Sequence, residues 1–229
     1  MNRKNRIVDI VFAAVSIAVG AFFIFSASVI IPITVRGYYF LHCRILNIPG
    51  TSGYSMEEIR LAFNDIMDFI WLGKPFAEGN LPYSAEGQAH FQDCVPLFWA
   101  DLIVFLVTLA LLIAYFVLLK TKVLRPHRFL GITGLAWSAF GLLATVAAIG
   151  IYAAIDFDGL FVAFHALFFP GKGNWVFDET TDPIIKMLPE SFFACCGAFI
   201  GTVALLLSGG FIGYSFATRK RYLRNKASE

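Results

Sequence analysis

Two histidines lie in segments whose composition could support acid–base chemistry beside a lipid phase. His90 is flanked by carboxylates, whereas His165 lies in the Phe-rich segment Phe161-Val-Ala-Phe-His-Ala-Leu-Phe-Phe169. The other two histidines, His42 and His127, lack such surroundings. Imidazole is the side chain whose ordinary pKa lies nearest neutral pH, so it can accept and donate protons there. A pair of imidazoles at a water–lipid boundary could therefore carry the proton transfers of a reaction on a lipid ester.

The acidic residues near His90 have helical spacing. Glu86 precedes it by four residues and Asp93 follows it by three, so all three share one face of a helix. A carboxylate beside the ring would hold one ring nitrogen and leave the other free for proton transfer. The alternative is a surface histidine with incidental acidic neighbours, which the local sequence alone favours.

His165 is a lone polar residue in an apolar segment. An ionisable group at membrane depth is energetically expensive, which makes it a functional candidate. The alternative is a histidine whose ring is hydrogen-bonded to a backbone carbonyl. Both interpretations are open at this point.

The composition excludes a soluble domain. The chain is 58% hydrophobic, with 25 Phe and a mean hydropathy of +0.71. A membrane span needs about 20 mostly apolar residues, and four runs qualify: 7–35, 95–119, 129–155 and 192–217. The first is too long for the apolar region of a signal peptide, about 7–15 residues. We predict an all-α membrane protein, a single four-span domain over residues 1–229.

The charges predict the orientation of these spans. Most Lys and Arg lie at the N-terminus, between the second and third runs, and in the C-terminal tail, whereas the loops 36–94 and 156–191 are acidic. By the positive-inside rule, both termini are cytoplasmic and both long loops lie outside. The net charge of +2 averages these two faces. It does not indicate nucleic-acid binding, and the basic clusters are expected beside membrane lipid.

The first long loop contains two predicted helices. Ser55 and Glu58 match a capping box, and the apolar residues that follow recur at helical spacing. This amphipathic helix could lie on the membrane surface or pack on the rest of the protein. A second helix is predicted to begin near Ser84 and to run, with Pro96 inside it, into the second span.

The second long loop contains shorter elements. We expect residues 156–169 to form an interfacial or re-entrant segment, because the stretch is too short to span. Trp175 is predicted to be an interface anchor. Asp182 and Pro183 predict the start of a short helix, and Pro189 precedes the fourth span.

Other features leave their questions open. Cys43 and Cys94 could both lie outside and form a disulfide, which their spacing does not decide. In the fourth run, Gly197-x-x-x-Gly201 and Gly209-x-x-x-Gly213 predict close helix packing. We expect that packing within one bundle rather than between two chains, and hence a monomer.

A metal site is an alternative to histidine chemistry. His90, Asp93, His165 and Glu190 are plausible zinc-type ligands near the outer face. The sequence has no H-E-x-x-H or other tight ligand spacing, and it has no G-x-S-x-G nucleophile motif. We therefore predict neither a metal nor a cofactor.

Four short motifs, taken in order, resemble the DUF1461 family of four-span bacterial membrane proteins, which includes the lipoprotein intramolecular transacylases. The residues that carry the resemblance are Glu86, His90 and Asp93; Phe164, His165, Phe168 and Phe169; Trp175 and Phe177; and Leu188, Pro189, Glu190, Phe192 and Phe193. Span order and loop lengths agree too, so the resemblance covers nearly the whole chain. One departure is Gln92-Asp93-Cys94, where an apolar residue before Asp93 and an aliphatic residue after it are expected.

The resemblance implies a specific reaction. Such enzymes move an acyl chain from the glycerol sn-2 oxygen of a diacylglyceryl-cysteine lipoprotein to its own α-amino group, which gives a lyso-form lipoprotein. The two essential histidines of the family correspond to His90 and His165. Both reacting groups belong to one substrate, so no external acyl donor or cofactor is implied.

The resemblance also suggests roles for the site residues. His90 is first favoured as the base, with His165 as the proton donor, and the two roles are open to exchange. The supporting carboxylates would be Glu86, Asp93 and Glu190, and the residues facing lipid would be Phe164, Phe168, Phe169 and Trp175. The alternatives are a metal-dependent membrane hydrolase and a non-catalytic four-span scaffold.

Overall fold

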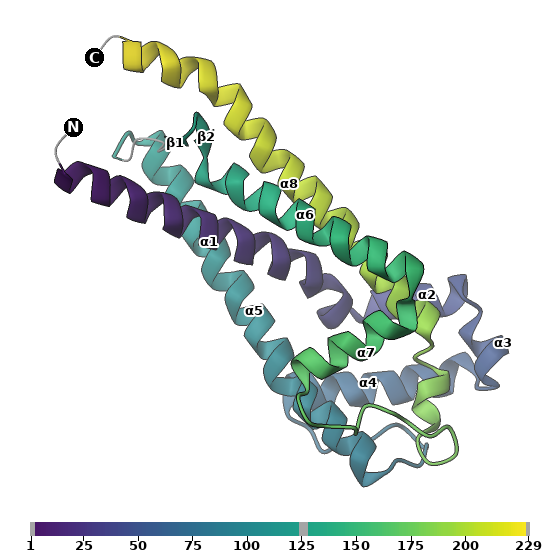
Figure 1. Ribbon diagram of the computed structural model, residues 1–229. Helices are drawn as coiled ribbons and strands as arrows, with labels where there is room; N and C mark the ends of the chain where they lie inside the picture. Colours follow the sequence, from purple (N-terminus) through teal and green to yellow (C-terminus); the bar gives the residue numbers. More distant parts are fainter. Residues whose placement is uncertain (1–2, 124–127, 228–229) are drawn as a thin grey trace. The chain divides into compact units, whose positions relative to one another are not determined.

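The computed structural model describes residues 3–123 and 128–227, so His127 lies outside the described residues. The elements, shown in Figure 1, are α1 (Arg3–Thr34), α2 (Arg36–Ile45), α3 (Ile48–Ser52), α4 (Met56–Leu72), α5 (Ala85–Lys120), β1 (Arg128–Phe129), β2 (Ile132–Thr133), α6 (Gly134–Ile155), α7 (Phe157–Phe168), the 3₁₀ helix Pro183–Lys186 and α8 (Glu190–Ala227). The described residues are mostly helical, as predicted, with two short strands.

Four helices are long and apolar enough to cross a membrane: Ile10–Thr34, Ala85–Lys120, Gly134–Ile155 and Glu190–Arg224. The second is one continuous helix that contains Pro96, so the outer helix and the span predicted after Ser84 are the same element. The predicted start of the third span at residue 129 is wrong. Residues 128–133 instead form the antiparallel hairpin β1–β2, and α6 begins after it.

The chain divides into two compact units. Unit 1 contains Met1–Ser28, Ile103–Ile151 and Ile200–Glu229, and unit 2 contains Val29–Leu102 and Tyr152–Phe199. Every predicted site residue lies in unit 2. The single domain expected over residues 1–229 stays a prediction.

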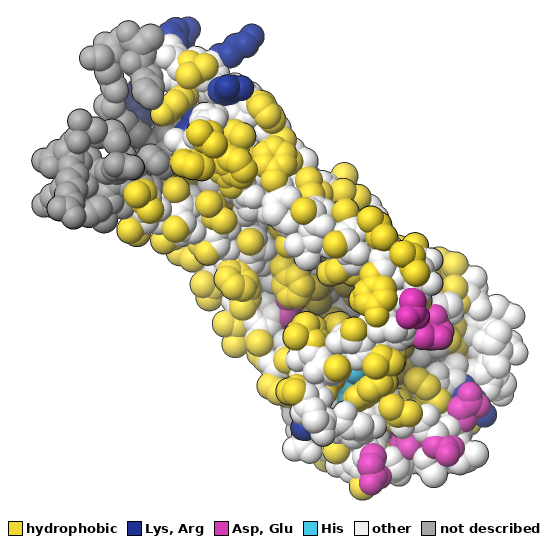
Figure 2. Space-filling model, in the orientation of Figure 1, with side chains coloured by type: hydrophobic (Ala, Val, Ile, Leu, Met, Phe, Trp, Pro, Cys, Tyr) yellow, Lys and Arg dark blue, Asp and Glu magenta, His cyan; other side chains and the backbone are white. Residues whose placement is uncertain are grey.

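In unit 1 the helices approach each other through small residues, but mostly not through the predicted ones. A Cβ on Gly20 of α1 would lie only 2.3 Å from the Ser138 hydroxyl of α6. A Cβ on Gly201 would lie 3.8 Å from a Val146 methyl group, whereas a Cβ on Gly209 or Gly213 would meet nothing within 4 Å. The same holds for Gly197, the motif glycine that belongs to unit 2. Figure 2 shows apolar side chains along the surface of these helices, as expected for helices exposed to lipid.

Unit 2 has an aromatic core built around α2 and α4. The capping box of α4 is present as predicted, with Ser55 and Glu58 each accepting a hydrogen bond from the other's backbone N–H. The apolar face of α4 is buried in this core rather than exposed. Tyr39 of α2 stacks on Phe63 of α4, with centroids 3.9 Å apart, and its hydroxyl donates to the Met187 carbonyl. The core therefore connects the two long loops.

A buried carboxylate lies between α4 and α5. The side chain of Glu78 is completely inaccessible, and neither carboxylate oxygen has a hydrogen-bond partner within residues 3–123 and 128–227. Burial, together with the negative charge of nearby Asp182, raises the pKa of Glu78 to about 8. Glu78 is therefore largely protonated at neutral pH.

We predict that Glu78→Gln stabilises the protein at high pH. A carboxyl whose pKa is raised in the folded state favours folding most below its ordinary value of 4.5 and loses that contribution as the pH rises to about 8. The neutral amide avoids this loss, so the variant should be more stable at pH 8 by roughly 1–3 kcal/mol, with the difference vanishing towards pH 4.5. Unfolding in micelles at both pH values measures this. The exposed Glu57→Gln is the control, and a variant less stable than the wild type at pH 8 would contradict the prediction.

Candidate active site

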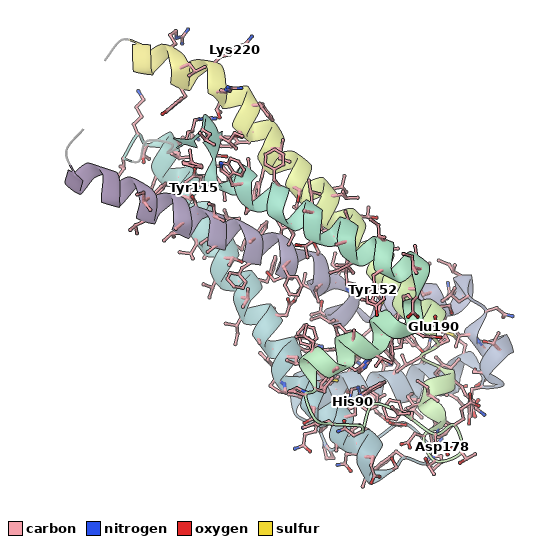
Figure 3. The ribbon with its side chains drawn as sticks, viewed as in Figure 1. His90, Tyr115, Tyr152, Asp178, Glu190 and Lys220 are labelled. Atoms are coloured by element: carbon pink, nitrogen blue, oxygen red, sulfur yellow. The ribbon has the colours of Figure 1, made fainter. Side chains whose placement is uncertain are left out.

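Unit 2 brings together two histidines that are far apart in the sequence. His90 comes from the second turn of α5, and His165 comes from α7. Their ring centroids are 5.8 Å apart, and the two residues are only 8% and 7% exposed. Figure 3 shows His90 among the side chains of this unit. The two rings therefore share one buried environment.

Aromatic rings enclose the histidine pair. Trp175 stacks on His165 at a centroid distance of 4.5 Å and an interplanar angle of 22°. Phe177 packs edge-on against His90 at 5.6 Å, and Phe169 contacts both imidazoles, at 4.9 Å from His90 and 5.8 Å from His165. Phe169 belongs to one of the four sequence motifs, and Trp175 and Phe177 form another. Two motifs therefore supply the rings that surround the histidine pair.

Asp93 holds the turn that carries Trp175. Its carboxylate accepts hydrogen bonds from the Lys172 ammonium and from the Asn174 amide, the latter at 3.0 Å. The Trp175 indole in turn donates to the Lys172 carbonyl at 3.1 Å. Asp93 was expected to bind and orient the His90 ring, but among the described residues it makes no hydrogen bond to His90.

Asp182 fixes the start of α5 from the other long loop. Its carboxylate accepts from the Ser84 backbone N–H at 2.8 Å. Asp182 precedes the short 3₁₀ helix that begins at Pro183, as predicted, but its side chain makes no capping hydrogen bond to that helix. A Cβ on Gly87 would lie 2.3 Å from this carboxylate, so the position favours glycine. Glu86, one residue earlier, is exposed and makes no hydrogen bond to His90 within the described part of the chain.

The two imidazoles differ in the hydrogen bonding of Nδ1, which is bonded in His165 and unpartnered in His90 among the described residues. His165 Nδ1 lies 2.8 Å from the Phe161 carbonyl oxygen, which only accepts, so Nδ1 carries the proton and Nε2 keeps its lone pair. Burial lowers the pKa of His165 below 6.5, although this hydrogen bond opposes the shift. His90 Nδ1 is buried without a hydrogen-bond partner among the described residues, and its Nε2 lies 3.8 Å from the Cys94 sulfur. The Cys94 contact was not predicted, although its four-residue spacing from His90 signals it.

Glu190 lines a cavity next to the histidine pair rather than touching it. It is the exposed first residue of α8 and is labelled in Figure 3. The cavity has a volume of about 570 Å³, and its lining includes Asp158, Phe161, Glu190 and Phe193. The Phe161 ring lies 4.2 Å from the His165 ring, so it contacts both the cavity and the imidazole.

The predicted lipid-facing aromatics fall into two groups. Phe164 and Phe168 are 49% and 39% exposed and pack against each other, whereas Phe169 is buried at 5%. Trp175 is half-buried against His165, and its role as an interface anchor stays a prediction.

The other proposed chemistries are not assembled among the described residues. In residues 3–123 and 128–227, no three His, Cys, Asp or Glu side chains form a metal-ligating group. Cys43 and Cys94 are both free thiols, so the disulfide left open by the sequence is not formed.

Residues 14–193 match the family model described as lipoprotein intramolecular transacylase Lit. The chain belongs to the Lit family. It is therefore an acyltransferase that carries out intramolecular transacylation of lipoproteins. No curated relative matches the sequence.

Solved structures of Lit from Bacillus cereus, a membrane-integral enzyme, have the same fold. One is 24% identical, with a TM-score of 0.75, over 97% of this chain and 99% of that chain. Two others have a single histidine replaced. The arginine variant is 24% identical over 98% of this chain and 96% of that chain, and the alanine variant is 25% identical over 98% of each; both have a TM-score of 0.69.

For this Lit family member we predict that Asp93→Ala impairs activity far more than stability. Asp93 and Lys172 are 23% and 48% exposed, so the ion pair itself contributes less than about 1 kcal/mol. Losing it frees the turn that places Trp175 on His165, and activity should fall about 10-fold because small displacements of catalytic groups are costly. Lipoprotein mass spectrometry and thermal unfolding measure the two effects.

The double variant Asp93→Ala/Lys172→Ala tests the cause. Because both side chains hold the same turn, it should be little worse than Asp93→Ala alone. If the activity loss of the double variant equals the product of the losses in the two single variants, the shared role of Asp93 and Lys172 is contradicted.

Proposed function

We propose that this enzyme transfers an acyl chain from the glycerol sn-2 ester of a diacylglyceryl-cysteine lipoprotein to the α-amino group of the same lipoprotein. The product would be the lyso form, with one acyl chain left on glycerol. The observation that supports this most is the buried pair of imidazoles. Nδ1 is hydrogen-bonded in His165, whereas in His90 it has no partner among the described residues. Well-oriented intramolecular reactions reach effective molarities of about 10⁵–10⁸ M, so a site that folds and holds its substrate needs no second donor.

His165 acts as the base. The Phe161 carbonyl holds its Nδ1 proton, which leaves the Nε2 lone pair to take the proton of the attacking nitrogen. The same proton then passes from Nε2 to the glycerol oxygen as the C–O bond breaks and the new C–N bond remains. This assignment moves the role of base, first favoured for His90, to His165, which also keeps the role of proton donor.

His90 stabilises the oxyanion. A buried imidazole without an anionic hydrogen-bond partner is favoured in its neutral form, which is a hydrogen-bond donor rather than a source of protons. Its unpartnered Nδ1 is suited to donate to the oxygen of the tetrahedral intermediate, where charge develops. The supply of a proton to the leaving oxygen stays with His165, as first expected.

The surroundings supply substrate-binding groups. Glu190 and Asp158 in the 570 Å³ cavity would attract the α-ammonium group of the substrate. Glu86 is exposed one turn before His90 and would face the substrate peptide. The exposed rings of Phe164 and Phe168 would contact the acyl chains. These roles require neither a metal nor a cofactor.

The site is placed on the extracytoplasmic side of a bacterial cytoplasmic membrane, with both termini in the cytoplasm. The acidic side chains visible in Figure 2 belong to unit 2, whereas Arg219 and Lys220 are exposed in unit 1 near the end of α8. Substrate lipoproteins and membrane lipid are the partners. We assign no nucleic-acid partner and regard the enzyme as a monomer.

Replacing either histidine should remove the activity from folded protein. His165→Ala should slow the reaction by about 10²–10⁴, the usual value of a general base, and His90→Ala by about 10²–10³ through loss of an oxyanion donor. The lyso product is quantified by lipoprotein mass spectrometry. His42→Ala is the matched control, since His42 makes the same type of bond, to the Tyr38 carbonyl at 2.8 Å. Full activity of either His90→Ala or His165→Ala would end this mechanism.

The pH dependence should report His165. Because burial lowers its pKa, the base stays neutral at pH 6.5 and is lost only as the pH falls through the lowered value. The substrate amine, with an ordinary pKa of about 7.7–8.0, gives log kcat/KM a slope of about 1 below neutrality. We expect that slope to steepen to about 2 only below pH 6.5. A second break at or above 6.5 would contradict the prediction.

A further inference from the structure

The contact between Cys94 and His90 has a chemical consequence. Cys94 lies one turn after His90 on α5, and its sulfur is 3.8 Å from His90 Nε2. The opposite ring nitrogen, Nδ1, is buried and unpartnered among the described residues, in a side chain that is 8% exposed.

The thiol can fix which nitrogen of His90 carries the proton. A thiol is a weak donor through S–H, and its sulfur is a weak acceptor too. The lone pair of an imidazole nitrogen is a better acceptor than sulfur, so S–H donation to the ring is favoured over N–H donation to sulfur. Donation to Nε2 requires a lone pair there, which places the ring proton on Nδ1. The alternative tautomer would put N–H against the weakly accepting sulfur, whereas Nδ1 is unpartnered among the described residues in either tautomer.

We propose that Cys94 is a positioning residue that donates its S–H to His90 Nε2 and so holds His90 in the tautomer with a free Nδ1–H. This inference rests on the proposed function, in which that N–H donates to the oxyanion. Two bonds, each within one helical turn, then give the rings opposite roles. Phe161 leaves His165 with a free lone pair, and Cys94 leaves His90 with a free donor.

The ¹⁵N chemical shifts of the His90 ring, measured in micelles at a pH where the ring is neutral, report its tautomer directly. The wild type should show a protonated Nδ1. Cys94→Ala should shift the ring toward a mixture of tautomers and lower kcat about 3–10-fold, the size expected for one hydrogen bond, with KM nearly unchanged. Cys94→Ser keeps a donor and should restore both the tautomer and kcat. Cys195→Ala is the control, because within residues 3–123 and 128–227 the Cys195 thiol makes no hydrogen bond to His90 or His165.

Two results would overturn the inference: a wild-type His90 protonated on Nε2, or a tautomer that Cys94→Ala does not change. An unchanged kcat in a Cys94→Ala protein with a shifted tautomer would also overturn it, because the positioning would then have no catalytic effect. Absence of lyso product from the wild type is a different outcome that overturns the proposed function. The tautomer measurement needs no substrate, so the two failures are distinguishable.

Discussion

The enclosure of two imidazoles by aromatic rings is the constraint on which the site depends. Trp175, Phe169 and Phe177 exclude water from His90 and His165, so each ring must obtain its hydrogen bonds from groups nearby. The Phe161 carbonyl supplies one such partner and the Cys94 thiol contacts the other ring. Burial thus favours neutral rings, and local hydrogen bonds decide which nitrogen carries each proton. Water-exposed histidines would exchange tautomers freely, so neither ring would have a fixed proton position.

The rest of unit 2 serves to bring α5 and α7 to the same place. Asp182 fixes the beginning of α5, and Asp93 binds the turn that follows α7. The Tyr39 hydroxyl connects the α2–α4 core to the second loop at Met187. Some of this arrangement has a cost, since Glu78 is buried without a hydrogen-bond partner among the described residues. The observed contacts of Asp93 and Asp182 are thus structural, and the proposed mechanism assigns the proton transfers to histidine.

Local patterns were predictable from the sequence, and long-range partners were not. The capping box of Ser55, the continuous helix through Pro96 and the four apolar spans follow from short-range periodicity and composition. The approach of His90 to His165 depends on tertiary packing, for which the resemblance to a family gave the only indication. Asp93 shows the limit most clearly. Its helical spacing from His90 suggested an orienting bond, but Lys172 and Asn174, from a loop far along the chain, bind the carboxylate instead. The hairpin at 128–133 likewise replaced a predicted helix start.

The central claim is that two imidazoles from distant segments meet in one aromatic enclosure. The most direct measurement is a nuclear Overhauser experiment on protein with protonated histidine rings in a deuterated background. With centroids 5.8 Å apart, the His90 and His165 ring protons should give a cross-peak. That peak should be absent in His90→Gln, and His42 should share no peak with either ring. Well-resolved His90 and His165 signals without a mutual cross-peak would contradict the account.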